Sequence, residues 1–300
     1  MSQSLEALVA HELERPSSPE IAAFAARLAR ETGAEAALFY GSVLRTGDLS
    51  GIADFYLLTP GPARGGWIGR RLWPDVSYRE AEIDGRVLRA KVATLPTRTF
   101  ARAAAGEFLD TTIWTRFVQP AALAFAADAA AAKTVRSAVC DACMTAARYA
   151  AALGPNAALA ADFWLALFRR TYRAELRVER PGREREILGY DPARYAALLP
   201  KAWTAAAIPF EQADGLLRPR LADGEAGRLR RAWRRREAWG KPLNALRLIK
   251  AASTFEGAAR YAAWKIERHT GVAVPLTPLE ERFPLLAAPK ALWRLARSRR

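Results

Sequence analysis

The stretch Phe39-Tyr40-Gly41-Ser42-Val43-Leu44-Arg45, followed by Ile52-Ala53-Asp54-Phe55-Tyr56, decides how the first part of the chain folds. The apolar run 36–40 predicts a short buried strand that ends at Gly41, and the residues after it favour a helix. A second apolar run, 52–58, predicts another strand, which a Pro- and Gly-containing turn stops. We therefore expect a strand, a Gly-Ser turn, a short helix and a second strand, in this order.

One carboxylate lies inside the second apolar run. Asp54 has apolar neighbours on both sides, and an ionised group in such a strand is costly unless a partner satisfies it. A strand-end charge is the simpler alternative. The pattern is similar to the start of nucleotidyltransferases, and this resemblance implies that Gly41 lets the backbone approach a phosphate chain and that the Ser42 hydroxyl, with the amides after it, binds phosphate oxygens. Asp54 would then hold Mg²⁺ between the phosphates and an attacking oxygen.

This Gly-Ser turn with a spaced strand aspartate resembles the beginning of the nucleotidyltransferase superfamily. Such enzymes usually carry a second acid two residues on, on the same strand face, and here that position is Tyr56. Glu80, Glu82 and Asp84 alternate along a predicted hairpin, which turns at Asp84-Gly85, so Glu82 or Asp84 is a candidate second metal ligand. A plain solvent-facing strand is an equally good reading of these acids.

Three more segments extend the resemblance over much of the chain. They are 67–78, with Trp67, Pro74, Ser77 and Tyr78; 85–92, which contains Arg89 and Lys91; and 248–266, which contains Lys250, Tyr261 and Lys265. Together with the Gly-Ser turn and Asp54, they resemble segments of the mitochondrial-type phosphatidate cytidylyltransferases. That family converts CTP and phosphatidic acid into CDP-diacylglycerol and pyrophosphate with Mg²⁺, so the resemblance implies this reaction, these partners and this cofactor.

The candidate site residues follow from both readings. Asp54 and Ser42 are the expected catalytic residues, and Asp54 and Glu82 are the expected metal ligands. The expected nucleotide-binding residues are Tyr40, Gly41, Ser42, Arg45 and Lys91. The expected phosphate- or lipid-binding residues are Arg89, Lys250 and Lys265, with Trp293, Arg294 and Arg297 near the C-terminus. For any one of these cations, ordinary exposed charge is the alternative.

The positive charge is concentrated toward the C-terminus. The net charge is +15; residues 218–300 contribute +13, from 20 Lys and Arg against 7 Asp and Glu. Such asymmetry indicates a polyanionic partner, either an anionic lipid surface or nucleic acid, although an Arg- and Ala-rich composition would also raise it. Residues 290–300 mix Leu and Trp with Arg, which is typical of a basic amphipathic helix at a membrane interface. A docked C-terminal helix is the alternative.

The expected fold class is α+β. We predict a nucleotidyltransferase-like mixed sheet with helices over 1–115, a mostly helical domain over 116–272, with a winged-helix arrangement as one option, and a basic tail over 273–300. Helices are predicted at 101–110, 121–152, 156–177, 191–206, 223–238 and 243–269. No run of eighteen apolar residues and no signal peptide is present, which favours a cytoplasmic protein peripheral on the inner face of the membrane.

Two other functions remain open at this stage. The basic helices would allow a nucleotidyltransferase with a nucleic-acid acceptor, which we consider less favoured than lipid. Tyr56 in place of an acid would fit an inactive nucleotidyltransferase fold that binds membranes. Cys140 and Cys143 form one CxxC pair on a predicted helix with no second pair nearby, so we expect neither a zinc site nor a redox centre there.

Overall fold

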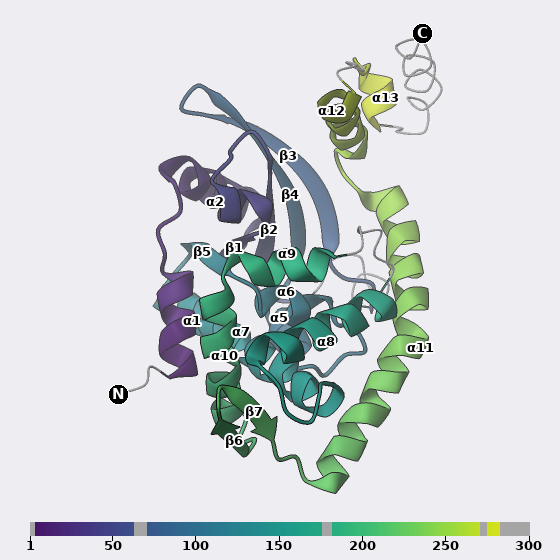
Figure 1. Ribbon diagram of the computed structural model, residues 1–300. Coiled ribbons are helices and arrows are strands. Elements are labelled where there is room, and N and C mark those ends of the chain that lie inside the picture. The colour runs from purple at the N-terminus through teal and green to yellow at the C-terminus, as the bar shows by residue number, and fades with distance from the viewer. Residues whose placement is uncertain (1–3, 63–70, 176–181, 271–274, 283–300) are drawn as a thin grey trace.

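A five-stranded mixed sheet organises the N-terminal part of the chain. The computed structural model describes residues 4–62, 71–175, 182–270 and 275–282. The sheet has the order β3-β4-β2-β1-β5 (Figure 1), with β2 and β4 parallel and the other neighbours antiparallel. Its strands are β1 (Ala36–Tyr40), β2 (Ile52–Thr59), β3 (Asp75–Ile83), β4 (Arg86–Pro96) and β5 (Ala121–Ala126). The predicted α+β class, the strands at 36–40 and 52–58 and the turn at Asp84-Gly85 are confirmed.

The strand register places four polar side chains in one row across the sheet. Tyr40 pairs with Asp54, Asp54 pairs with Lys91, and Lys91 pairs with Tyr78. Because directly paired residues point to the same side of a sheet, these side chains share one face. The row connects the end of β1 to the outer strand β3.

The opposite face of the sheet is covered by α2 (Pro19–Thr32). This helix begins after the Ser18 cap and ends at Gly33, which has a positive φ. Its Phe24 packs edge-on against Phe55 of β2, with ring centroids 6.0 Å apart, and Phe39 of β1 packs beside Phe55 at 5.3 Å. This small aromatic core fixes β1 and β2 against α2.

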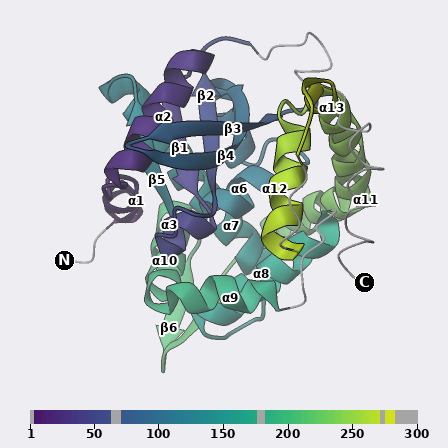
Figure 2. The same cartoon turned by 90° about the horizontal axis from the view of Figure 1, so that it is seen from above.

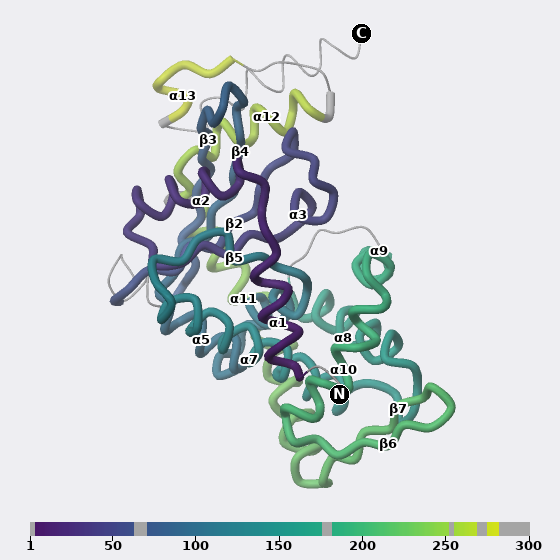
Figure 3. Tube along the Cα trace, turned by 90° about the vertical axis from the view of Figure 1, so that its left-hand side faces the viewer, coloured from purple at the N-terminus to yellow at the C-terminus, as the bar shows by residue number. Residues whose placement is uncertain are grey.

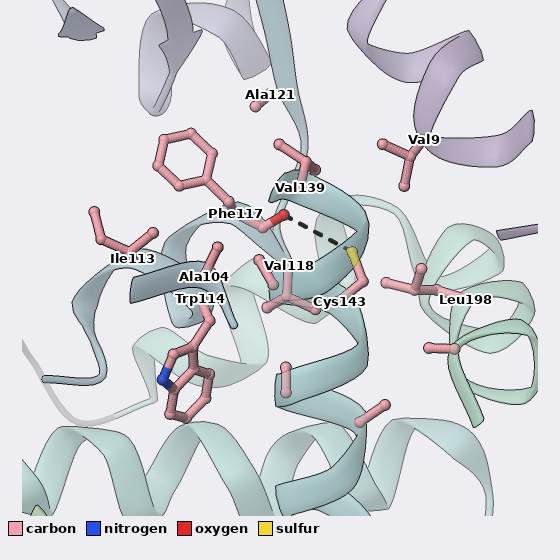
Figure 4. Packing of buried hydrophobic residues seen from close by; sticks show 14 of the residues in the cluster. Val9, Ala104, Ile113, Trp114, Phe117, Val118, Ala121, Val139, Cys143 and Leu198 are labelled. Atoms are coloured by element: carbon pink, nitrogen blue, oxygen red, sulfur yellow. Dashed lines mark hydrogen bonds between the residues drawn. The ribbon is translucent and has the colours of Figure 1, made fainter. Parts of the chain in front are cut away.

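The face that carries the polar row packs on the main core. Tyr40 and Tyr56 contact Phe117, and Phe100 joins the same cluster. These rings are held by α5 (Thr97–Ala104), α6 (Thr112–Phe117) and the central helix α7 (Ala129–Leu153). Figure 4 shows part of this core, with Phe117 and Trp114 beside α7. The polar row therefore lies at the border of a dry core.

The remaining helices gather around α7. Helices α8 (Ala160–Ala174), α9 (Arg183–Tyr190) and α10 (Pro192–Ala205) lie together with the hairpin of β6 (Phe210–Ala213) and β7 (Leu216–Pro219) at one end of the molecule (Figure 3). Helix α1 (Leu5–Leu13) packs on α7 and α10. Buried Trp164 and Trp203 donate hydrogen bonds to the carbonyls of Tyr195 (3.0 Å) and Ala147 (2.9 Å), which ties these helices together.

A long helical arm completes the described fold. Helix α11 (Asp223–Thr254) runs along one edge of the molecule and leads to α12 (Ala258–Thr270) and α13 (Pro278–Arg282), as Figures 1 and 2 show. Short α3 (Ser42–Thr46) follows the turn after β1. Helix α12 reaches β3, where the Tyr78 amide donates to the Glu256 carbonyl at 2.8 Å. Arg79 and Glu256 form a two-pronged ion pair beside that bond.

Three sequence predictions are wrong in detail. Residues 121–126 form the edge strand β5 rather than the start of a helix, and because β5 pairs with β1, the boundary expected at 115 falls inside the sheet. Residues 210–219 form the β6–β7 hairpin, which was not predicted. The helices expected at 223–238 and 243–269 are instead α11, which runs through Pro242, and the separate α12.

The two cysteines are free thiols on α7. Cys143 is buried in the main core, where its Sγ lies 3.9 Å from the Phe117 carbonyl oxygen (Figure 4). Burial raises the pKa of Cys143 to about 12 and that of Cys140 to about 11. Both groups are therefore poor nucleophiles at neutral pH.

Candidate functional site

The turn at Gly41 brings backbone and carboxylate together. Gly41 has φ +91° and ψ −158°, a conformation that is essentially restricted to glycine. A Cβ at this position would lie 2.5 Å from the Asp54 Oδ2 atom. Glycine is thus required twice, once by the backbone angles and once by the approach of Asp54. The predicted pairing of the Gly-Ser turn with the strand aspartate is a contact in the structure.

A cavity of about 210 Å³ opens at this turn. The sheet and the turn after β1 supply Tyr40, Gly41 and Asp54, and α3 supplies Ser42 and Arg45. The opposite walls come from α6 and the residues after it and from α8 and α9. Those walls are lined by Arg116, Gln119, Pro120, Tyr172, Arg183 and Ile187. The cavity therefore lies between the sheet and the helices packed around α7.

The charges that line the cavity are mostly positive. Among the described residues, three arginines, Arg45, Arg116 and Arg183, line the cavity together with one carboxylate, Asp54. The Arg183 guanidinium also pairs with Glu186 at 2.6 Å. Burial raises the pKa of Asp54, and the neighbouring cations Lys91, Arg116 and Arg45 oppose that rise. Burial, together with the nearby charge of Arg183, lowers the pKa of Arg45. Cations that crowd each other in this way favour an anion with several negative oxygens.

Arg116 is the innermost of these cations. Its guanidinium carbon lies 4.9 Å from the centre of the Tyr40 ring and 6.0 Å from that of Tyr56, so both rings stabilise the charge. Its Nε atom is buried and has no hydrogen-bond partner among the described residues. Burial also raises the pKa of Tyr40, which keeps the phenol protonated. The two tyrosine rings therefore hold Arg116 in place, and its Nε atom can still donate a hydrogen bond.

Lys91 lies next to the carboxylate on β4. It is the direct strand partner of Asp54, and its positive charge favours the ionised form of that group. Lys91 is half-buried, and no ion pair or hydrogen bond of its side chain is formed within the described residues. Lys91 therefore acts on the cavity through Asp54 and does not itself form part of the cavity lining.

Among the residues that the structure describes, no second carboxylate lines the cavity beside Asp54. Glu82 pairs with Val87, four residues along β3 from the Tyr78 position that completes the polar row, and its side chain is exposed. Two strand spacings and four residues of rise separate it from Asp54 by roughly 16 Å. Asp84 lies farther out, in the hairpin turn. The prediction that Glu82 binds a metal together with Asp54 is therefore corrected: the strand register places Glu82 away from the cavity.

Of the other predicted phosphate- or lipid-binding cations, the three that the structure describes also lie outside the cavity. Arg89 pairs with Glu80 at 3.3 Å, and Lys250 donates to the Leu72 carbonyl at 2.8 Å and pairs with Asp75. Lys265 is exposed, with its ammonium 5.4 Å from the centre of the Tyr261 ring. Trp67, Trp293, Arg294 and Arg297 lie outside the described residues. Lys250 holds α11 to the start of β3, which is a structural role.

Two cavity cations were missed by sequence reasoning. Arg116 sits in the segment Ile113-Trp114-Thr115-Arg116-Phe117-Val118, and a single charge among buried apolar residues was the available signal. Arg183 begins the charged run Arg183-Glu184-Arg185-Glu186, which looks like any exposed helix start. Only the packing of α9 against α8 turns Arg183 toward the cavity.

The carboxylate in the cavity fits a metal ion that binds together with the phosphates of a substrate. Across 4–62, 71–175, 182–270 and 275–282, no three His, Cys, Asp or Glu residues gather into a metal-binding group. One carboxylate combined with substrate phosphates is, however, a usual Mg²⁺ arrangement. Asp54 could hold one such ion against bound phosphates, where it would neutralise phosphate charge. A protein-built site for two metals does not fit these residues.

No protein-family model matches this sequence, and no curated protein is significantly similar to it. Within the described residues, no helix is both long enough and apolar enough to cross a membrane.

Proposed function

We propose that the chain is a nucleotidyltransferase that converts CTP and phosphatidic acid into CDP-diacylglycerol and pyrophosphate at a membrane surface. The observation that carries the proposal is the contact between the glycine-only turn at Gly41 and Asp54, in a cavity with three arginines. A tight turn, one carboxylate and several guanidinium groups suit a polyphosphate ester. The choice of CTP and of the lipid acceptor comes from the resemblance of the sequence segments.

Each cavity residue has a defined part in this proposal. Arg45, Arg116 and Arg183 bind phosphate oxygens, and the Ser42 hydroxyl lies at the turn where it can donate to one of them. Asp54, whose ionised form is favoured by the charge of Lys91, is the group that would hold Mg²⁺ with the phosphates. Tyr40 supports Arg116 through its ring.

The reaction is an in-line displacement at phosphorus. A phosphate oxygen of phosphatidic acid attacks the α-phosphorus of CTP and forms a new P–O bond. The bond from the α-phosphorus to the oxygen that bridges to the β-phosphate breaks, and pyrophosphate leaves with that electron pair. The guanidinium groups would stabilise the charge that builds up on the departing pyrophosphate. The +13 charge of residues 218–300 would favour peripheral binding at the anionic inner face of the membrane.

The test is pyrophosphate release from CTP with Mg²⁺ and phosphatidic-acid vesicles, alongside ATP, GTP and UTP. We expect CTP-selective, lipid-dependent release. Asp54→Ala should abolish it, whereas Glu82→Ala, which removes a carboxylate outside the cavity, should leave it unchanged. Loss of release in both variants, or in neither, would contradict the assignment of Asp54.

Two other functions are distinguished by the same assay. The single carboxylate among the described cavity residues also suits an inactive nucleotidyltransferase fold that binds membranes, and that function predicts binding to the vesicles with no pyrophosphate release. The exposed arginines of α11 would suit a nucleic-acid acceptor, and that function predicts release that depends on RNA rather than on lipid.

A further inference from the structure

From Arg236 to Lys250, helix α11 has three cations on the side that contacts the rest of the protein. Arg236 is buried and donates to the carbonyls of Gly106 (2.6 Å) and Phe108 (3.0 Å). Further along the helix, Arg247 pairs with buried Asp110, and Lys250 pairs with Asp75 from the same inner side. A helix on the surface of a water-soluble protein normally turns its apolar side inward and its charges outward. In α11, Arg236, Arg247 and Lys250 on the inner side make charged contacts instead.

Four large apolar residues of α11 between Trp239 and Ile249 are exposed, and three of them lie on one side of the helix. Trp239, Leu246, Leu248 and Ile249 are 60, 52, 62 and 68% exposed, and they are four of the nine strongly exposed large apolar side chains in the described part of the chain. At 100° per residue, Trp239, Leu246 and Ile249 fall within about 80° of one another around the helix. Exposed apolar side chains gathered in this way mark an interaction surface.

The same outer face continues as a cationic strip toward the start of α11. Arg228, Arg231 and Arg235 are exposed and fall within the same arc as the three apolar residues. The nearby acids Glu225 and Glu237 lie outside that arc, and Glu237 accepts a hydrogen bond from the Trp233 indole at 2.7 Å. We call Arg228, Arg231, Arg235, Trp239, Leu246 and Ile249 the outer strip. Figures 1 and 2 show α11 at the periphery of the molecule.

We propose that the outer strip of α11 lies on an anionic lipid bilayer, with its apolar half inserted at the headgroup level and its arginines against lipid phosphates. Charge complementarity selects this occupant, because three cations without an acid on their arc match a negative surface. Trp and branched apolar residues on one side of a helix are the usual inserting groups. A second copy of the chain would present the same cations and gain no complementarity.

The proposal deepens the proposed function, since it names the surface that would place the cavity at its lipid substrate. It uses a different part of the chain from residues 290–300. The fold around α11 does not depend on the outer strip, because the strip is exposed along its length and the helix is held from inside by Arg236, Arg247 and Lys250.

The experiment is flotation of the full chain, without nucleotide, on two kinds of vesicle. One is phosphatidylcholine alone, and the other contains about 30 mol% phosphatidylglycerol, which is anionic without being the proposed substrate. We expect binding to the anionic vesicles. Trp239→Ser/Leu246→Ser/Ile249→Ser should reduce it by about tenfold or more. Arg228→Gln/Arg231→Gln/Arg235→Gln should reduce it toward the level on neutral vesicles, as high salt should for the unaltered chain.

The matched control is Val87→Ser/Leu216→Ser, which removes exposed apolar side chains elsewhere and should bind like the unaltered chain. Equal binding of the outer-strip and control variants would overturn the proposal, and so would an unaltered chain that binds neither vesicle. Light scattering provides a further check. A mass of twice 33.0 kDa that the triple Ser variant halves would assign the strip to self-association instead.

A failure of this proposal is distinguishable from a failure of the proposed function. Pyrophosphate release with a short-chain, water-soluble phosphatidic acid requires the cavity and not the bilayer. Release without flotation would refute the outer strip alone, and flotation without release would refute the proposed reaction alone.

Discussion

At the scale of single residues, Gly41 carries the most demanding geometry in the cavity. We predict that Gly41→Ala destabilises the fold by about 3 kcal/mol, because the backbone angles and the approach of Asp54 both exclude a Cβ. Nucleotide binding should be lost with it. Gly33→Ala is the control: that glycine also has a positive φ, but open space surrounds it, so only about 1–2 kcal/mol is expected. Urea denaturation measures both, and equal losses would contradict the contact with Asp54.

Arg116 offers a second test at this scale. We predict that Arg116→Gln weakens pyrophosphate binding by about tenfold or more, because it removes a charge-assisted contact inside the cavity. Arg102→Gln is closely matched, since the Arg102 guanidinium also lies 4.9 Å from the centre of an aromatic ring, that of Phe108, but outside the cavity. Calorimetric titration of both variants should show an effect only for Arg116. Similar affinities for the two variants would refute a phosphate-binding role.

The ionisation of Asp54 can be read from stability alone. Burial raises its pKa in the folded state, so its contribution to stability is fully present below the unfolded value of about 3.9 and is lost as pH rises through the raised pKa. As pH rises from about 3.9 through the raised pKa, the free energy of unfolding of the Asp54→Asn variant should therefore increase relative to that of the unaltered chain.

Asp48 provides a control of opposite sign. Hydrogen bonds from Ser50 lower the pKa of Asp48, so its contribution is present above the unfolded pKa and is lost as pH falls through the folded one. As pH falls, the free energy of unfolding of the Asp48→Asn variant should increase relative to that of the unaltered chain. Denaturation series over acidic to neutral pH would check both, and parallel trends for the two variants would show that Asp54 is not perturbed as described.

How much of this site was predictable differs from residue to residue. Gly41, Ser42, Arg45 and Asp54 were predictable, because they lie close together in sequence on one strand–turn–helix–strand unit. Arg183 was not, since packing between distant helices places it. The position of Glu82 was mispredicted because alternation gives the face of a strand but not its register against a neighbour.

At the scale of elements, α11 holds the start of α6 in place. Asp110 accepts hydrogen bonds from the Thr112 amide (2.9 Å) and hydroxyl (3.1 Å) and pairs with Arg247 of α11. We predict that Asp110→Ala costs about 3–5 kcal/mol, because it leaves a buried guanidinium without its carboxylate. The accompanying Arg247→Met change should recover part of that loss, which a double-mutant cycle in urea would measure.

An exposed pair gives the scale for comparison. Arg27 and Glu31 form an i,i+4 pair on α2 at 2.9 Å, and both side chains are largely exposed. Glu31→Ala should cost only about 0.3–0.5 kcal/mol. A cost for Asp110→Ala as small as this would mean that α6 does not depend on α11.

The elements that were mispredicted share a physical reason. The segment Ala121-Ala122-Leu123-Ala124-Phe125-Ala126 is rich in helix formers, yet it forms β5 because the free edge of β1 supplies hydrogen-bond partners. The predicted helices 223–238 and 243–269 left a gap that contains Pro242, yet α11 continues through it. That proline is exposed, so water can reach the carbonyl that its missing N–H leaves free. In both cases tertiary context overrides local propensity.

At the scale of the whole molecule, one hydrophobic core joins the sheet to the helices that were predicted to form a separate domain. The main core contains Tyr40 and Tyr56 from the sheet, Cys143 from α7, Trp164 from α8 and Trp233 from α11 in a single cluster. The sequence favoured a separate helical domain from residue 116, but a pattern of predicted helices does not show which faces pack together. The cavity depends on this shared core, since its walls come from both sides of the expected boundary.

This shared core makes the expected boundary at 115 testable. We predict that a fragment of residues 1–115 does not fold, because it lacks the edge strand β5 and helix α7, which covers the sheet face that carries Tyr40 and Tyr56. Circular dichroism in urea should show no cooperative transition. A chain that ends at residue 282 keeps every residue of both core clusters and should unfold cooperatively. Cooperative unfolding of the 1–115 fragment would show that the sheet is stable without the helices, and that the arginines from α6 and α9 join a site that the sheet has already formed.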